Sequence, residues 1–318
     1  MYHRIAEPES DAWDITVTKK NFEQQLQVLN KTGRVISVNE LVEDVICKTV
    51  KKNSIAITFD DGYADNYYTA KPLLEKYELP ATFFIASANT GKNNEFWWDE
   101  LEHLFLFTEH LPSLFLFTIN GKQINFNLNK EEKLNRDIIQ KHKLWKACDE
   151  TPPTIRCQLF YKVWEELKPL PAEEQQQEMQ LIRTWADSST STRADYVSMS
   201  AEQLKELKEN ELFEIGAHTT NHAALAFHPK DFQKNELSKN MSFLKEITGK
   251  EVTLFTYPYG NYNHETLNVV SDMHLKAAFT TEEITVKNQS KRYRLGRLQV
   301  KNWKEEDFKN KLRYWSTL

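Results

Sequence analysis

The sequence SIAITFDDG, residues 54–62, runs from a short apolar segment into two aspartates and a glycine. An apolar run bounded by turn-forming residues predicts a buried strand, which here ends near Phe59. A helix is predicted over residues 64–77, and ATFFIAS (81–87) has the composition of the next buried strand. A strand, a helix and a strand in this order are typical of an α/β fold with a parallel sheet.

The same alternation continues on both sides of this segment. Helices are predicted over residues 19–31, where Thr18 can cap the first turn, and in SVNELVEDVI, where Ser37 and Glu40 have the spacing of a capping box. Further strands are predicted in LFEIGAH, VTLFTY, KAAFTT and RLGRLQV, and further helices in SAEQLKELKEN, residues 231–248 and EEDFKNKLRYW. We therefore expect strands and helices to alternate toward both ends of the chain.

Residues 96–195 interrupt this alternation. They contain a predicted hairpin, LFLFTINGKQINFNL, that turns at Asn120-Gly121, followed by long charged helical segments. We therefore predict two units. One is a barrel formed by residues 1–95 and 196–318, and the other is an inserted hairpin and helical subdomain.

Composition places the chain among ordinary globular proteins. Hydrophobic residues make up 40% and charged residues 27% of the 318 residues, and the formal net charge is −5 with a pI near 6.0. A nucleic-acid-binding protein needs a clustered basic face, so no nucleic-acid partner is expected. No stretch approaches the roughly 20 apolar residues of a membrane-spanning helix, and no transmembrane segment is expected.

Two further observations bear on the cellular compartment. The first residues, MYHRIAEPES, lack the basic and apolar regions of a signal peptide. The three cysteines, Cys47, Cys148 and Cys157, match no metal-ligand spacing, and reduced thiols are expected for them. A cytoplasmic location is therefore expected, whereas no pattern indicates the oligomeric state.

Two pairs of polar residues follow predicted strands. Asp60 and Asp61 lie at the carboxyl end of the first strand, where parallel α/β folds bind ligands, although aspartates at such a place also cap helices or stabilise turns. His218 and His222 follow another strand, and in a helical turn their spacing would put both rings on one face. Two histidines and a carboxylate, with open positions, are the ligands of a hydrolytic zinc site.

These motifs resemble those of the polysaccharide deacetylases with a NodB homology domain, carbohydrate esterase family 4. The family's TFDD motif stands at residues 58–61, and its H-[ST]-x-x-H motif stands at residues 218–222. FTYPYG approximates the family's Arg-x-Pro-Tyr loop, because Pro258 and Tyr259 match while the arginine is absent.

The resemblance covers about residues 1–95 and 196–300. It implies the distorted (β/α)7-type barrel of the NodB or polysaccharide deacetylase fold, with a large inserted subdomain. It also implies that Asp61, His218 and His222 hold a divalent metal. Zinc is the default ion for such a set, and cobalt, nickel or iron are the alternatives.

The resemblance further implies three catalytic roles. Asp60 would be the general base, and the backbone N–H of Tyr259, fixed by Pro258, would stabilise the oxyanion. The family's usual C-terminal Leu-x-His histidine is missing here. Circularly permuted members, such as those acting on poly-N-acetylglucosamine, carry the equivalent histidine at the N-terminus in a Tyr-His context, so MYHRI makes His3 the candidate general acid. The alternative is that His3 is a frayed terminal residue.

Four residues are candidates for substrate binding, namely Pro258, Trp97, Trp98 and Arg297. Arg297, on the last predicted strand, could reach the space of the missing arginine, although a surface salt bridge is the more usual role of an arginine. Trp97 and Trp98 could stack on a sugar ring and bind substrate. The alternative is that both tryptophans form part of the core of the insertion.

The function implied by the resemblance is that of a hydrolase acting on linear amide C–N bonds, which removes an N-acetyl group from a polysaccharide, an oligosaccharide or a glycan precursor. The expected partner is therefore an N-acetylated carbohydrate. One alternative is a deacylase of another small amide, such as a nucleotide sugar or a formylated sugar. The alternative of another class is an inactive carbohydrate-binding protein.

Overall fold

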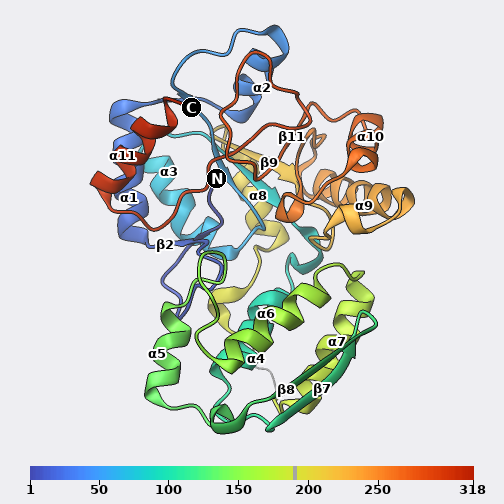
Figure 1. Ribbon diagram of the computed structural model, residues 1–318. Helices are drawn as coiled ribbons and strands as arrows, with labels where there is room; N and C mark the ends of the chain where they lie inside the picture. The colour runs from blue at the N-terminus through green and yellow to red at the C-terminus, as the bar shows by residue number, and fades with distance from the viewer. Residues whose placement is uncertain (189–191) are drawn as a thin grey trace. The chain divides into compact units, whose positions relative to one another are not determined.

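The structure is a computed structural model that describes residues 1–188 and 192–318; residues 189–191 of the predicted insertion lie outside the described part. The chain divides into two compact units (Figure 1). The barrel unit comprises Met1–Glu7, Ile15–Lys92 and Ser198–Leu318. The inserted unit comprises Pro8–Asp14 and Asn93–Val197.

A five-stranded parallel sheet forms the centre of the barrel unit, with the strand order β11-β10-β9-β6-β5. Its strands are β5 (Ile57–Phe59), β6 (Ala81–Ile85), β9 (Phe213–Ala217), β10 (Leu254–Thr256) and β11 (Ala277–Phe279). Every residue of β5, β6, β10 and β11 is buried. Strands that are buried on both faces read as continuous apolar runs, and for this reason the sequence predicts them well.

Two irregular segments extend this sheet and curl it toward a barrel. Tyr2 forms an isolated parallel bridge with Phe59 of β5, and Leu295 forms one with Phe279 of β11. Between these segments, the Val300 N–H donates to the carbonyl of Met1 at 3.0 Å. The expected parallel α/β barrel architecture is thus confirmed for the barrel unit.

The strand predicted in RLGRLQV is wrong. Apart from the Leu295 bridge, residues 294–300 form no strand, because successive amides bond different partners. The Arg297 N–H donates to the carbonyl of Glu282, whereas Val300 bonds a segment from the other end of the chain. Apolar residues recur in this segment because it is an irregular loop that is partly buried, and this pattern resembles that of a strand.

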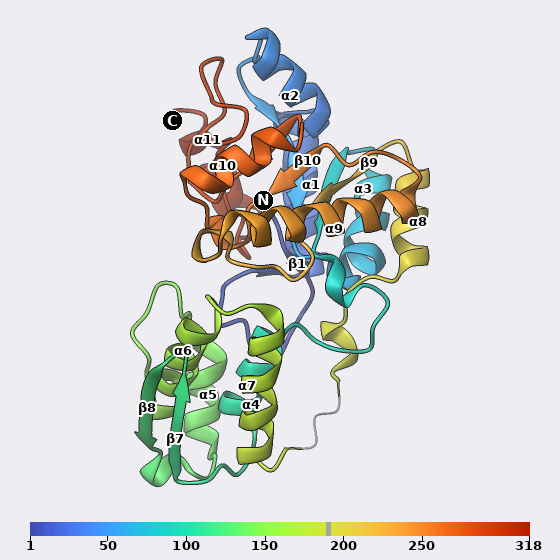
Figure 2. The same ribbon diagram turned by 90° about the vertical axis from the view of Figure 1, so that its right-hand side faces the viewer.

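Helices cover the outside of the sheet, and Figure 2 shows α9 lying across β9 and β10. The helices of the barrel unit are α1 (Lys19–Thr32), α2 (Val38–Cys47), α3 (Lys71–Lys76), α8 (Ala201–Glu209), α9 (Lys230–Thr248), α10 (His264–Asp272) and α11 (Glu305–Trp315). A π-helix, Asn66–Ala70, precedes α3, and 3₁₀ turns occupy Ser87–Asn89, Leu225–Phe227 and Pro258–Gly260. Two short parallel pairs complete the unit, β1 (Arg4–Ile5) with β2 (Thr16–Val17) and β3 (Arg34–Val35) with β4 (Ser54–Ile55).

Local capping explains where several of these helices begin. Thr18 accepts a hydrogen bond from the N–H of Asn21, as predicted. Ser37 accepts one from the N–H of Glu40, which is one half of the predicted capping box. The predicted strand SIAITF is divided, because β4 and β5 belong to different sheets and the residue between them belongs to neither.

The inserted unit contains a hairpin and four α-helices among its described residues. The hairpin consists of β7 (Leu114–Ile119) and β8 (Lys122–Asn127), and the helices are α4 (Trp97–Phe107), α5 (Arg136–Leu144), α6 (Ile155–Leu167) and α7 (Ala172–Trp185). Its 3₁₀ turns are Asn129–Glu131 and Ala194–Tyr196. Asn120 and Gly121 both have positive φ, as the two-residue turn of a hairpin requires.

The segment Pro8–Asp14 belongs to the inserted unit, although its position in the sequence placed it with the barrel. The Ser10 hydroxyl donates to Glu102 at 2.7 Å, and the ring centre of Trp13 lies 4.4 Å from that of Trp164. An isolated stretch of seven residues carries no sequence signal for such long-range packing.

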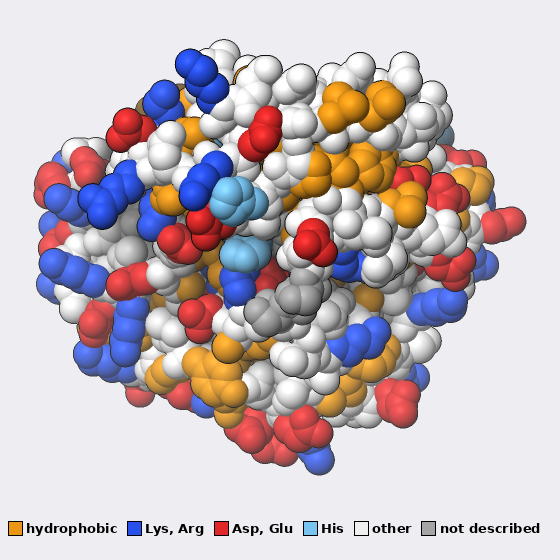
Figure 3. All heavy atoms as spheres, turned by 90° about the horizontal axis from the view of Figure 1, so that it is seen from below, with side chains coloured by type: hydrophobic (Ala, Val, Ile, Leu, Met, Phe, Trp, Pro, Cys, Tyr) orange, Lys and Arg blue, Asp and Glu red, His pale blue; other side chains and the backbone are white. Residues whose placement is uncertain are grey.

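On the face shown in Figure 3, basic and acidic side chains are interspersed, and hydrophobic side chains form groups between them. None of the helices in the described part of the chain has the length and apolar composition needed to cross a membrane.

Candidate active site

The candidate metal ligands converge at the carboxyl ends of β5 and β9. Asp61, His218 and His222 each offer one ligand atom, and these atoms lie within 4.8 Å of one another. Asp61 Oδ1 is 3.4 Å from His218 Nε2 and 3.2 Å from His222 Nε2. Two ligands of a tetrahedral zinc ion lie about 3.4 Å apart when each bond is about 2.1 Å long. The separations therefore fit a common cation.

The hydrogen bond of His218 supports the same conclusion. Its Nδ1 lies 2.9 Å from the carbonyl oxygen of Thr256, so Nδ1 carries the proton and Nε2 presents a lone pair. That lone pair faces a carboxylate oxygen of Asp61. Two acceptors at this distance repel each other unless a cation or a proton lies between them, and the donor set therefore suits a divalent metal.

Burial and the histidines have opposite effects on the charge of this cluster. Burial opposes ionisation of Asp61, but the adjacent imidazoles of His218 and His222 outweigh it and hold the pKa of Asp61 well below its usual value. Burial lowers the pKa of His222, against the opposing charge of Asp61. A carboxylate and a neutral imidazole are the protonation states in which these groups bind metals.

The HTTNH segment forms an irregular loop, so the expected helical turn is wrong. Thr219 and His222 have φ values of 62° and 54°, in the left-handed region that residues with a Cβ rarely adopt. Strained conformations of this kind persist only when surrounding contacts impose them.

Helix α9 supplies the contacts that impose this conformation. Asn240 Oδ1 accepts the N–H of His218 at 3.1 Å, while its Nδ2 donates to Ile85 O and Ser87 Oγ. One turn earlier, Glu236 accepts both the N–H and the Nδ2 of Asn221, at 2.8 and 2.7 Å. The loop that carries both histidines is thus bound to one face of α9.

Asp60 is held by an arginine from the other end of the chain. Arg297 Nη1 and Nη2 donate to the two carboxylate oxygens of Asp60 at 2.7 and 2.6 Å, and both residues are buried. Burial alone would raise the pKa of Asp60, but the charge and hydrogen bonds of Arg297 lower it below its usual value. Arg297 was a candidate for substrate binding; its guanidinium instead forms the paired contact expected of the missing arginine.

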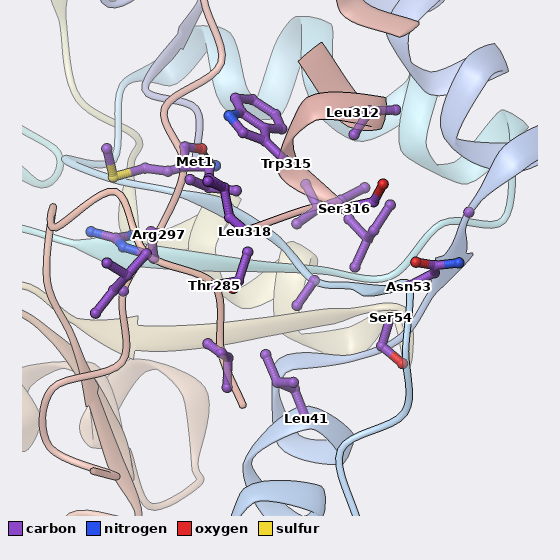
Figure 4. A pocket seen from close by; sticks show the side chains of 18 of the residues that line it. Met1, Leu41, Asn53, Ser54, Thr285, Arg297, Leu312, Trp315, Ser316 and Leu318 are labelled. Carbon is purple, nitrogen blue, oxygen red and sulfur yellow. Dashed lines mark hydrogen bonds between the residues drawn. The ribbon is translucent and has the colours of Figure 1, made fainter. Parts of the chain in front are cut away.

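Arg297 also lines a cavity of about 850 Å³ (Figure 4). The lining is largely apolar and includes Leu41 of α2 and Trp315 of α11. Asp60, Asp61, His218 and His222 are not among the residues that line it. The cavity is therefore separate from the candidate metal ligands.

His3 lies within the electrostatic influence of the same cluster. Burial lowers the pKa of its imidazole, and the charges of Asp61 and Asp60 act in the opposite direction. The neighbouring Tyr2 bonds the strand end, since its N–H donates to the carbonyl of Thr58 at 2.8 Å. The backbone of His3 therefore lies in a bonded segment, which does not fit a frayed terminus.

Pro258 and Tyr259 form a 3₁₀ turn after β10. Tyr259 has a φ of 58°, and its ring meets that of His222 edge to face with centres 4.4 Å apart. The strained turn thus lies against a candidate metal ligand, and the role of the Tyr259 N–H toward an oxyanion stays a prediction.

Trp97 and Trp98 lie in the inserted unit and are 6% and 4% exposed. Their ring centres are 5.7 Å apart, and the ring of Trp98 stacks on Phe96 at 4.5 Å. This packing favours the alternative in which both tryptophans belong to the core of the insertion. Contact with a sugar stays a prediction.

Comparison with known proteins places the chain in a family. The sequence model of one family, described as polysaccharide deacetylase, matches residues 47–106 and 173–278, which together exceed half of the chain. The chain belongs to the polysaccharide deacetylase family. The recognition drawn from TFDD, HTTNH and FTYPYG is thereby confirmed.

Individual relatives of the family cover different shares of the chain. YxkH of Bacillus subtilis (strain 168) is 31% identical over 130 residues, which are 39% of this chain and 43% of that protein. The poly-β-1,6-N-acetyl-D-glucosamine N-deacetylase of Staphylococcus aureus (strain N315) is 28% identical over 137 residues, 43% of this chain and 44% of that protein. The chain thus spans less than half the length of these curated relatives.

A solved structure confirms the deacetylase fold over nearly the whole chain. The deacetylase PplD of Streptococcus pyogenes, in complex with acetate, superposes with a TM-score of 0.60. The match covers 98% of this chain and 96% of that one at 18% identity, so the likeness concerns the fold.

Sequence reasoning missed the residues of α9 that support this candidate site. Gln233, Glu236 and Asn240 are buried on the same side of the helix as Leu237 and Leu244. A helix that buries one face normally has apolar residues there. Polar residues at such positions indicate hydrogen bonds to neighbouring segments, because buried polar groups must be bonded. That signal could have identified α9 as a support helix.

We predict that Arg297→Ala lowers the free energy of unfolding of the metal-free protein by about 3–5 kcal/mol at pH 7, because it leaves the Asp60 carboxylate buried without a counter-ion. The folded-state pKa of Asp60 is lowered from 3.8, so the ion pair contributes fully above that value and is lost as the pH falls below it. The difference between variant and wild type should therefore shrink only as the pH falls below 3.8. Urea unfolding followed by circular dichroism measures it.

Arg34→Ala is the matched control for this prediction. It removes an exposed arginine paired with Glu40, whose side chains are 42% and 45% exposed, and should cost less than about 1 kcal/mol. Equal effects of the two variants would contradict a special role for the buried pair.

Proposed function

We propose that this chain is a metal-dependent hydrolase that removes an N-acetyl group from an N-acetylated sugar. The observation that carries the proposal is the convergence of Asp61, His218 and His222 next to a carboxylate, Asp60, that Arg297 keeps ionised. Membership of the polysaccharide deacetylase family supports the same reaction class.

Each group of the site has a definite task in such a reaction. A divalent cation bound by the three ligands would supply Lewis acidity toward water and the acetyl carbonyl. Asp60 accepts the proton of the attacking water, which requires the ionised form that Arg297 favours. The N–H of Tyr259 donates to the developing oxyanion, and His3 gives a proton to the amine nitrogen as the C–N bond breaks. The products are acetate and the free amino sugar.

The substrate class follows from the relatives. The Staphylococcus aureus relative is named as an N-deacetylase of poly-β-1,6-N-acetyl-D-glucosamine, so an N-acetylglucosamine polymer or oligomer is the first substrate to test. Zinc is the proposed metal, with cobalt, nickel and iron as alternatives. A formylated sugar or a nucleotide sugar is the second candidate within the same chemistry.

Acetate release tests the proposal. The zinc-loaded protein is incubated with β-1,6-linked N-acetylglucosamine oligomers, with β-1,4-linked oligomers and with UDP-N-acetylglucosamine, and acetate and free amine are both quantified. We expect equal amounts of the two products from at least one oligomer. Binding of the oligomers without any acetate would instead support an inactive carbohydrate-binding protein.

A further inference from the structure

Asp65 and Asn66 end the sequence DDGYADN (residues 60–66), yet neither is a candidate metal ligand or proton carrier. Asp65 precedes the π-helix Asn66–Ala70, but its side chain caps no amide of that helix. Asn66 is fully buried. A buried amide and a carboxylate without a role in their own helix need partners elsewhere.

Both side chains bind the N-terminal segment of the barrel unit. Asp65 Oδ1 accepts the N–H of Ile5 at 2.9 Å, and its Oδ2 accepts Nε of Arg4 at 3.0 Å. Asn66 Nδ2 donates to the carbonyl oxygen of His3 at 2.8 Å. His3, Arg4 and Ile5 are thus each bound by either Asp65 or Asn66.

The ion pair in this set is buried. The side chains of Arg4 and Asp65 are 2% and 10% exposed, and the Arg4 guanidinium lies 4.6 Å from the ring centre of Tyr63. Separating a buried pair is costly, whereas exposed pairs separate freely. The contact therefore restrains the segment.

The segment is also fixed on the other side of His3. Asp60 N–H donates to the carbonyl of Tyr2 at 3.0 Å, and the hydroxyl of Tyr2 bonds Gln25 in the interior. Successive side chains of an extended chain point to opposite faces. His3 is thereby turned away from Gln25, toward the charges of Asp60 and Asp61 that act on its imidazole.

We propose that Asp65 and Asn66 are positioning residues that clamp residues 3–5 to the DDGYADN loop and so orient His3 toward the leaving amine. The inference rests on the proposed function, in which His3 is the general acid. The candidate base Asp60 and the candidate acid His3 come from separate stretches of the chain, and the clamp gives them one common support. A small displacement of a proton donor is sufficient to slow its reaction strongly.

A double-mutant cycle between Asn66 and His3 tests the proposal. Asn66→Asp keeps the shape of the side chain but places a carboxylate against the His3 carbonyl and the Asp65 carboxylate. We expect kcat for acetate release to fall about 30-fold, with KM within about twofold and the metal content per chain unchanged. In the His3→Ala background, the same substitution should lower kcat less than about twofold, because the group that it positions is already absent.

Hydrogen exchange provides a readout that does not depend on activity. Amide exchange in the peptide that covers residues 2–7 should accelerate on the order of tenfold in Asn66→Asp, since its bonds to the loop are weakened. Asn268→Asp, on an exposed face of α10, is the matched control and should change neither kcat nor exchange. If Asn66→Asp does not fold, Asp65→Asn enters the same cycle.

The outcomes separate the inference from the proposed function. Equal losses of kcat in both backgrounds, unchanged exchange at residues 2–7, or loss of metal would overturn the positioning role while acetate release by the wild type still stands. A wild-type protein that releases no acyl group would overturn the proposed function and the catalytic purpose of the clamp together.

Discussion

Asp60→Asn is expected to lower kcat for acetate release by about three orders of magnitude, while the protein still binds its metal. The amide has the size of the carboxylate but cannot accept the proton of the attacking water, and a general base contributes about 10²–10⁴ in rate. The substitution leaves the three candidate metal ligands, Asp61, His218 and His222, in place. Acetate release at saturating substrate, together with metal analysis of the same sample, measures the effect.

The variant also leaves Arg297 without its charged partner, so its fold must be checked independently. Its melting temperature should be lower than that of the wild type, but its circular dichroism at 25 °C should be the same. Asp272→Asn, which removes an exposed aspartate paired with Lys230, is the matched control and should retain wild-type kcat. A kcat of Asp60→Asn within tenfold of the wild type would rule out the role of general base.

Removal of the metal is expected to have an equally large effect. Dialysis against a chelator should reduce acetate release below detection, and added zinc should restore it, because the site has no other Lewis acid. His222→Ala removes one of the three ligands and should lower the zinc affinity at least 100-fold. Competition with a chromogenic chelator measures this affinity without reference to activity.

His264→Ala provides the control for the ligand substitution. His264 is exposed on α10 and is not part of the candidate metal cluster, so its loss should leave zinc affinity unchanged. Acetate release that survives complete chelation, or a His222→Ala variant with wild-type zinc affinity, would contradict the assigned ligand set.

The sequence predicted the parts of the fold that depend on local chemistry. The buried strands β5, β6, β9, β10 and β11 read as apolar runs, and the Asn120-Gly121 turn and the Thr18 cap have direct local causes. The candidate metal ligands were found because their motifs each follow a strand end, and the ends of parallel strands meet at one edge.

Long-range contacts set the limit of that prediction. Arg297 and Asp60 are 237 positions apart, and the loop that presents Arg297 has the apolar alternation of a strand without being one. The positive φ values of Thr219 and His222 arise from contacts to α9, so the local sequence does not predict them. The place of Pro8–Asp14 in the inserted unit likewise depends on packing partners about 90 or more positions away.

The attachment of the HTTNH loop to α9 has a consequence for ion selectivity. Glu236 and Asn240 hold the loop in its strained conformation through contacts that involve no ion. The arrangement of the candidate ligands is therefore fixed by the protein before any ion binds. An ion that requires a different bond length or number of ligands would have to deform a helix and two strand ends together. A rigid site of this kind should therefore select ions by size and preferred geometry.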